Sequence, residues 1–187
     1  MNRLVIFIFL FIAHCCVSGC STTKPGTRIN YHSDFERTSF SGVYLGNYGD
    51  YSQSFQATNA KLLKITEEGR FLAHAFRARL SQSGDGFFVN KVAFEADGQK
   101  FEIEAGWSNY DINIHTYGST HYEILTAQFT EQQLEMLANA SAIRVRFYGQ
   151  EHNSPVFTLN NEGREAFKIY YNEQVLGIQP TLETKKD

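Results

Sequence analysis

Cysteine is scarce in this chain and unevenly distributed. All three cysteines lie within the first twenty residues, at Cys15, Cys16 and Cys20, and none follows. The chain after residue 20 therefore has no disulfide, no thiolate ligand for a metal and no thiol nucleophile. This absence excludes a disulfide scaffold, a zinc ribbon, and redox or hydrolytic enzymes that depend on cysteine.

A large excess of charge of one sign is also absent. The chain has 17 Lys and Arg residues against 20 Asp and Glu residues, for a formal net charge of −3. Nucleic-acid-binding proteins usually carry a concentrated basic stripe, and the sequence has none, so a nucleic-acid partner is not expected. Hydrophobic residues make up 42% of the chain and aromatic residues 14%, which is enough to bury the core of one folded domain.

The hydrophobic run near the start is too short to span a membrane. Leu4 to Ala13 is unbroken apolar sequence that follows Arg3. A spanning helix needs about 20 apolar residues. A shorter run after a positive charge and before small residues is typical of a secretory signal peptide. We therefore expect this segment to be a cleavable signal peptide.

Small residues and a cysteine follow this run. Val17, Ser18, Gly19 and Cys20 resemble the lipobox of bacterial lipoproteins at each position. The cysteine thiol is a strong nucleophile, and small side chains before it let the backbone enter a peptidase site. The resemblance implies a diacylglyceryl thioether on Cys20, cleavage before it, and acylation of the new amine. An ordinary secretory signal cut near Ser18 or Gly19, and an uncleaved anchor, are the alternatives.

The resemblance also implies a location. Ser21 stands where an Asp would favour retention in the inner membrane of enteric-type bacteria, so we expect a lipid-anchored protein of the outer membrane, on its periplasmic or its outer face. We expect a signal peptide over residues 1–19, a lipidated N-terminus and flexible tether over 20–39, one β-rich domain over 40–177 and a tail over 178–187. The covalent lipid is the expected modification, and no cofactor is predicted.

Alternating hydrophobic residues between turn residues predict strands in the middle of the chain. Residues 60–66 and 71–80 flank Glu67-Glu68-Gly69 and predict a hairpin. Residues 87–96 and 99–105 flank Asp97-Gly98, a pair suited to a type I′ turn. Residues 111–117 and 121–129 form a third predicted pair, and 143–147 and 156–159 predict two further strands.

Two short helices are expected among the strands. Thr130 followed by Gln133 matches a capping box, and Asn160 or Asn161 can cap a second helix. Many short strands with two helices predict a mainly β or α+β domain, an antiparallel sandwich with the helices at its edge or end.

Two pairs of arginines are candidate binding residues. Arg77 and Arg79, and likewise Arg144 and Arg146, are two residues apart on predicted strands, so both members of each pair lie on one face. If the two strands were neighbours, four guanidinium groups would converge and could bind phosphate or carboxylate. The alternative is a solvated sheet face on which the arginines pair with Glu residues.

A cluster of possible metal ligands occupies the third hairpin. His121 and Glu123 share one face of their strand, with His115 and Asp111 on the partner strand. Their spacing matches no metal motif, and polar strand residues facing water explain them equally well.

Motifs of serine hydrolases, G-x-S-x-G and S-x-x-K, are missing. The prediction is therefore a non-enzymatic envelope lipoprotein that binds another protein or an envelope polymer, or assists assembly. The competing hypotheses are an envelope metal-dependent hydrolase that uses His115, His121 and Glu123, and a small inhibitor or immunity-like protein.

Overall fold

The computed structural model describes residues 23–33, 37–48, 55–84, 87–116, 118–150 and 152–179, with only the backbone described at 33, 107–110 and 115. This part of the chain is mainly antiparallel β-sheet with two short α-helices, which confirms the predicted fold class. Its strands are β1 (Arg28–Ser33), β2 (Thr38–Tyr48), β3 (Phe55–Glu67), β4 (Arg70–Ser83), β5 (Val89–Ala96), β6 (Gln99–His115), β7 (Gly118–Phe129), β8 (Ile143–Gly149) and β9 (Phe157–Thr158). The helices are α2 (Glu131–Asn139), α3 (Asn161–Tyr170) and a π-helical turn, η1 (Tyr171–Val175).

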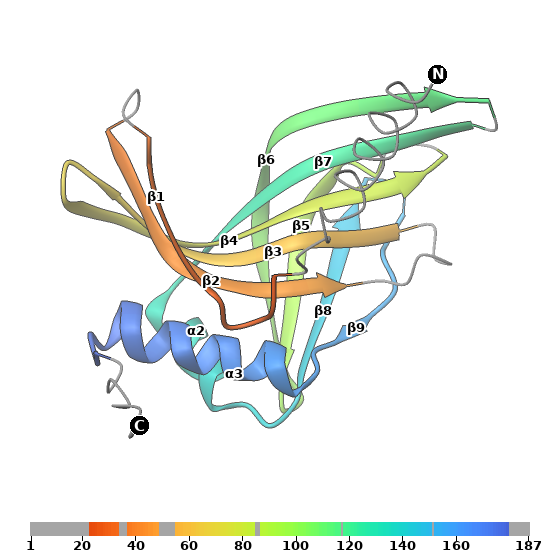
Figure 1. Cartoon of the computed structure of the whole chain (residues 1–187). Helices are drawn as coiled ribbons and strands as arrows, with labels where there is room; N and C mark the ends of the chain where they lie inside the picture. Colours follow the sequence, from red (N-terminus) through yellow and green to blue (C-terminus); the bar gives the residue numbers. More distant parts are fainter. Residues whose placement is uncertain are drawn as a thin grey trace, which may run out of the picture.

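The described strands form one bent sheet in the order β1-β2-β3-β4-β7-β6-β5-β8-β9. The bend lies in β6, because the first part of this strand pairs with β5 and its second part pairs with β7. Strands β1 to β4 and β7 form the larger part of the sheet, and β5, β8 and β9 form the smaller part (Figure 1). The two parts enclose the core between them.

The core lies on the inner face of the bent sheet, where the helices close it (Figure 1). Phe76 of β4, Phe94 of β5 and Phe147 of β8 bring the two parts of the sheet together, with ring centroids 5.5 Å apart for Phe76 and Phe94. Leu134 and Leu137 of α2 and Ala166, Phe167 and Tyr170 of α3 are buried on the sides of the helices that face the sheet. Burial of these side chains is the main term that stabilises the fold.

The turns and caps agree with the predictions. Glu68 and Gly69 both have positive φ between β3 and β4, and Asp97 and Gly98 do the same between β5 and β6. The predicted capping box is present at Thr130 and Gln133, which begins α2. Asn160 caps α3 by accepting a hydrogen bond from the backbone N–H of Gly163 at 2.9 Å.

Two features differ from the predictions. Strand β1 lies within residues 20–39, where the sequence predicts a tether. It pairs with β2, and the ring of Tyr31 stacks on that of Phe40 at 4.4 Å, so burial of apolar surface holds this segment in the sheet. The predicted strands at 99–105 and 111–117 are parts of one strand, β6, because the backbone stays extended through Gly106.

The predicted signal peptide and lipobox, including Cys20, lie outside the described residues. Across the part of the chain that the structure describes, no helix has the length and hydrophobicity needed to cross a membrane.

Candidate functional site

Three basic side chains meet on the outer face of the larger part of the sheet, opposite the core. Lys61 of β3 pairs in register with Arg77 of β4, and Arg79 follows two residues later on the same face. Neighbouring strands lie about 5 Å apart and residues i and i+2 about 7 Å apart, so the three Cα atoms are close neighbours. We call Lys61, Arg77 and Arg79 the basic trio.

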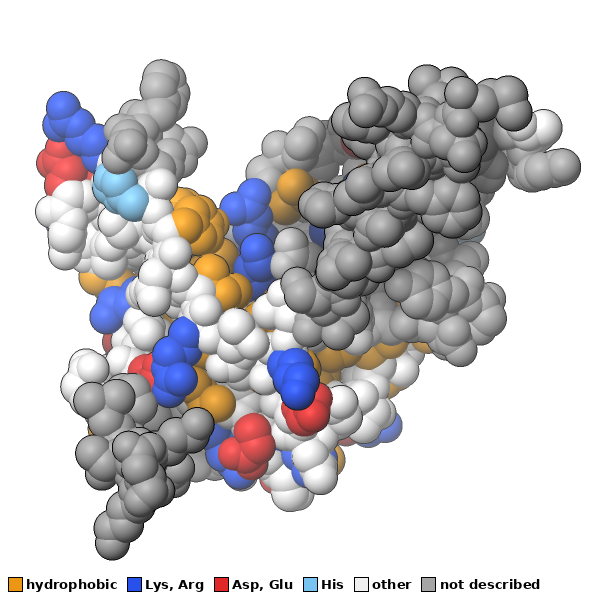
Figure 2. All heavy atoms as spheres, in the orientation of Figure 1, with side chains coloured by type: hydrophobic (Ala, Val, Ile, Leu, Met, Phe, Trp, Pro, Cys, Tyr) orange, Lys and Arg blue, Asp and Glu red, His pale blue; other side chains and the backbone are white. Residues whose placement is uncertain are grey.

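The basic trio lines a shallow hollow with a volume of about 230 Å³. Asn59, Ala78 and Ile124 complete its lining. Figure 2 shows basic side chains gathered in a depression on this side of the molecule, next to hydrophobic ones. The hollow is smaller than pockets for drug-sized ligands, so it suits one compact charged group.

The charges of the basic trio are not neutralised by neighbouring carboxylates in the described part of the chain, since no ion pair there involves Lys61, Arg77 or Arg79. Burial and the nearby positive charge of Arg77 lower the pKa of Lys61. Arg79 lies over the ring of Tyr122, with its guanidinium carbon 4.3 Å from the ring centroid. This stacking orients the guanidinium group and leaves its N–H groups available to a ligand.

The second arginine pair does not join the first. Arg144 and Arg146 are on β8, which is separated from β4 by β7, β6 and β5. Arg144 forms an ion pair with Glu95 of β5. Arg146 donates a hydrogen bond from Nε to the backbone carbonyl of Ser154 at 3.1 Å. The predicted convergence of four guanidinium groups is therefore not present, and this pair matches the predicted alternative of a partnered sheet face.

The face around Arg144 is a network of opposite charges. Glu102 of β6 accepts from Lys100 at 2.7 Å and forms an ion pair with Lys91 at 2.9 Å. The hydrogen bond from Lys100, followed by that from Lys91, lowers the pKa of Glu102 to about 2. Balanced pairs of this kind need no external ligand, in contrast to the basic trio.

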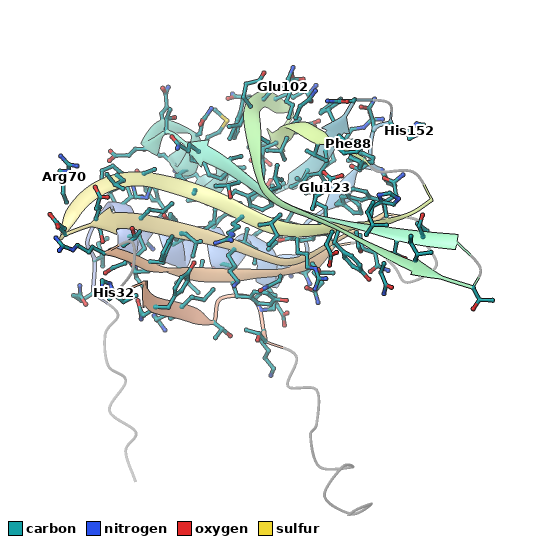
Figure 3. The ribbon with its side chains drawn as sticks, turned by 90° about the horizontal axis from the view of Figure 1, so that it is seen from above. His32, Arg70, Phe88, Glu102, Glu123 and His152 are labelled. Atoms are coloured by element: carbon teal, nitrogen blue, oxygen red, sulfur yellow. The ribbon has the colours of Figure 1, made fainter. Side chains whose placement is uncertain are left out.

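The proposed metal ligands have other partners. Glu123 of β7 is only 3% exposed, and its carboxylate accepts three backbone N–H groups. Phe87 and Phe88 donate to Oε1 at 3.0 and 2.6 Å, and Val89 donates to Oε2 at 3.0 Å. Figure 3 shows Glu123 and Phe88 close to each other. Glu123 therefore fixes the chain where it enters β5.

The histidines of the same cluster are not brought to Glu123 by any described contact. His121 Nε2 lies 3.2 Å from the hydroxyl oxygen of Ser119. The side chain of His115, next to the turn between β6 and β7, lies outside the described residues. Within the described ranges, no group of three or more His, Cys, Asp or Glu side chains is placed to hold a metal ion.

One buried polar pair joins the sheet to α3. His74 Nδ1 and the hydroxyl oxygen of Tyr170 are 2.8 Å apart, and both residues are buried. Burial lowers the pKa of His74 and raises that of Tyr170. Both groups are therefore neutral near pH 7, and the pair has a structural role in the interior.

Comparison of the chain with protein-family models, with curated proteins and with solved structures found no match. Function is therefore inferred from the side chains. Among the candidate residues, Arg77 and Arg79 were predicted from their spacing, whereas Lys61 was missed, because its place opposite Arg77 depends on the strand register.

Proposed function

We propose that this protein is a lipid-anchored envelope lipoprotein whose β domain binds an anionic group of an envelope polymer, or of a protein partner, through the basic trio. Cys20 carries the lipid, and the outer membrane is the site of attachment. The observation that carries the binding proposal is the cluster of Lys61, Arg77 and Arg79, none of which forms an ion pair with a carboxylate of the described residues.

Charge and burial both support a binding role. Positive charges held close together repel each other, and burial, followed by the positive charge of Arg77, lowers the pKa of Lys61. A bound anion relieves this repulsion, which makes the site complementary to negative charge. The described lining of the hollow has basic, amide and apolar side chains, which suit binding better than acid–base catalysis.

An envelope polymer is the partner that fits this site best. Polymers of the outer envelope carry repeated phosphate and carboxylate groups, and a protein held on the membrane by lipid meets them at high local concentration. Binding through three cations near the surface is weakened by salt, because counterions screen exposed charges over about 10 Å at 0.1 M salt.

The test is cosedimentation of the full-length lipidated protein, in detergent, with purified lipopolysaccharide and with cell-wall sacculi. The variant K61Q/R77Q/R79Q should lose most of the retention, and wild-type retention should fall as salt rises. The matched control, R144Q/R146Q, changes two arginines on the other part of the sheet and should bind as wild type does. Equal retention of both variants would contradict the proposal.

The anchor is tested separately by intact mass and membrane fractionation of wild type beside Cys20→Ala. The wild type should carry a lipid-sized mass increment and sediment with outer membranes, and the variant should lack both. If neither protein were lipidated and both were soluble, a freely secreted binder or inhibitor would replace the lipoprotein proposal.

A further inference from the structure

We infer that the basic trio recognises a phosphate monoester, such as the phosphate at the end of a sugar or lipid headgroup. This inference rests on the proposed function and specifies its ligand. It follows from how the three cations are arranged, how many charges they carry and how small the hollow is.

The arrangement suits a tetrahedral anion with several oxygens. Lys61 and Arg77 lie opposite each other on the neighbouring strands β3 and β4, and Arg79 lies two residues further along β4. Long side chains from Cα atoms about 5 to 7 Å apart can reach different oxygens of one group. A phosphate monoester offers three terminal oxygens, one for each cation, whereas a carboxylate offers two and a diester two.

Charge also favours the monoester. None of the three cations forms an ion pair with a carboxylate of the described residues, so a monovalent anion leaves most of their repulsion in place. A phosphate monoester carries about −1.5 to −2 near pH 7. Arg79 is oriented by its contact with Tyr122, which prepares its fork of N–H groups for bidentate contact with phosphate oxygens.

This chemistry predicts a distinctive pH dependence. The second pKa of a phosphate monoester is about 6, so binding should weaken as the pH falls through this value. The titratable groups of the described residues on this face include Tyr31 of β1, Tyr44 of β2, Lys61 of β3, Tyr122 of β7, and Asp111 and Glu104 of β6. The ordinary pKa of tyrosine and lysine is about 10, that of glutamate about 4.3 and that of aspartate about 3.9, and arginine stays charged throughout. A change in binding affinity centred near pH 6 is therefore caused by titration of the phosphate monoester.

Isothermal titration of the full-length protein in detergent is the test, with glucose 1-phosphate, glucuronate and diethyl phosphate as probes. Glucose 1-phosphate should bind at least about tenfold more tightly than the other two at pH 7.5, and its affinity should fall at pH 5. R77Q should weaken binding by about tenfold or more, since each charge-assisted contact contributes roughly that much. R77K should also weaken it, because lysine keeps the charge but lacks the fork.

The control is R144Q, which should bind glucose 1-phosphate as wild type does. Circular dichroism and thermal unfolding of R77Q, R77K and R144Q should match wild type, so that a lost affinity is not a lost fold. Phosphatidylcholine vesicles with and without phosphatidic acid distinguish a lipid-borne phosphate from a soluble one, and specific binding to either source supports the inference.

Two results would overturn the inference while leaving the proposed function intact. One is equal, pH-independent binding of all three probes. The other is no binding of any probe, including the phosphatidic acid vesicles, by a protein whose retention on polymer still depends on the basic trio. If retention on polymer is also independent of the basic trio, the proposed function and the inference both fail.

Discussion

Replacing the buried Glu123 should destabilise the domain more than replacing the exposed Glu104. Its carboxylate is buried and accepts N–H groups from Phe87, Phe88 and Val89. Phe88 also has φ of 50°, a backbone conformation that costs a residue with a side chain about 1–2 kcal/mol. The three hydrogen bonds hold this unfavourable conformation in place.

The expected loss of stability follows from the number of N–H groups that donate to Glu123. Glu123→Ala leaves three N–H groups without their acceptor, and an unsatisfied buried donor costs about 1–3 kcal/mol. Phe88 is only half-buried, so we expect a total loss of about 3–5 kcal/mol, which is the range for breaking a buried charged pair. Glu123→Gln keeps the volume and one acceptor oxygen, but places an NH₂ group against N–H donors, and should cost about 2–3 kcal/mol.

Urea unfolding followed by circular dichroism measures both values. With a typical slope of about 1–3 kcal/mol per molar urea, the midpoint of Glu123→Gln should fall by about 1 M or more. Glu104→Gln, an exposed glutamate of β6, is the matched control and should change stability by less than about 0.5 kcal/mol. If Glu123→Gln were as stable as Glu104→Gln, the three hydrogen bonds would not stabilise the fold as argued.

Two further predictions concern other polar contacts. The pKa of His74 is lowered by burial, so the unfolded chain binds its proton near pH 6.5 while the folded chain does not, and stability should fall as the pH drops from 7.5 to 5.5. His74→Gln should make the urea midpoint less sensitive to pH over that interval. If the midpoint of the variant changed with pH as much as that of wild type, His74 would not be the cause of the pH dependence. Asp97 accepts hydrogen bonds from the backbone N–H groups of Ser141 and Ala142 at 3.0 and 2.8 Å. Asp97→Ala should therefore lower the free energy of unfolding by about 1–2 kcal/mol. A variant as stable as wild type would show that these hydrogen bonds do not stabilise the fold.

Local sequence signals predicted most of the strands, both helices and their caps. The two-residue turns at Glu68-Gly69 and Asp97-Gly98 fix hairpin registers through positive φ, which few residues other than glycine, asparagine and aspartate adopt easily. Strand β1 was missed because its residues are mostly polar and its stability comes from pairing with β2, a contact between segments that local pattern does not reveal.

The candidate site depended on a feature that the sequence does not show. A regular hairpin that begins with Glu67 opposite Arg70 would place Lys61 opposite Phe76. The register shifts by one residue between Ile65 and Thr66, which moves Lys61 opposite Arg77 instead. A β-bulge of this kind changes which residues share a face, so the basic trio became visible only in three dimensions.

The role of Glu123 also could not be predicted. From the sequence, a glutamate two residues after His121 suggests a metal ligand or a solvated strand face. Its three N–H donors come from residues 87–89, which lie more than thirty positions earlier in the chain. Long-range contacts to the backbone leave no periodic signal in the sequence.

The most direct test of the basic trio is the pKa of the Lys61 amine, measured by NMR titration of its side chain. It should lie below that of an ordinary lysine, because of burial and Arg77, and it should rise both in R77Q and on addition of glucose 1-phosphate. R144Q should leave it unchanged. A Lys61 pKa at the ordinary lysine value, unaffected by R77Q and by the phosphate probe, would contradict the account of an unneutralised cationic site.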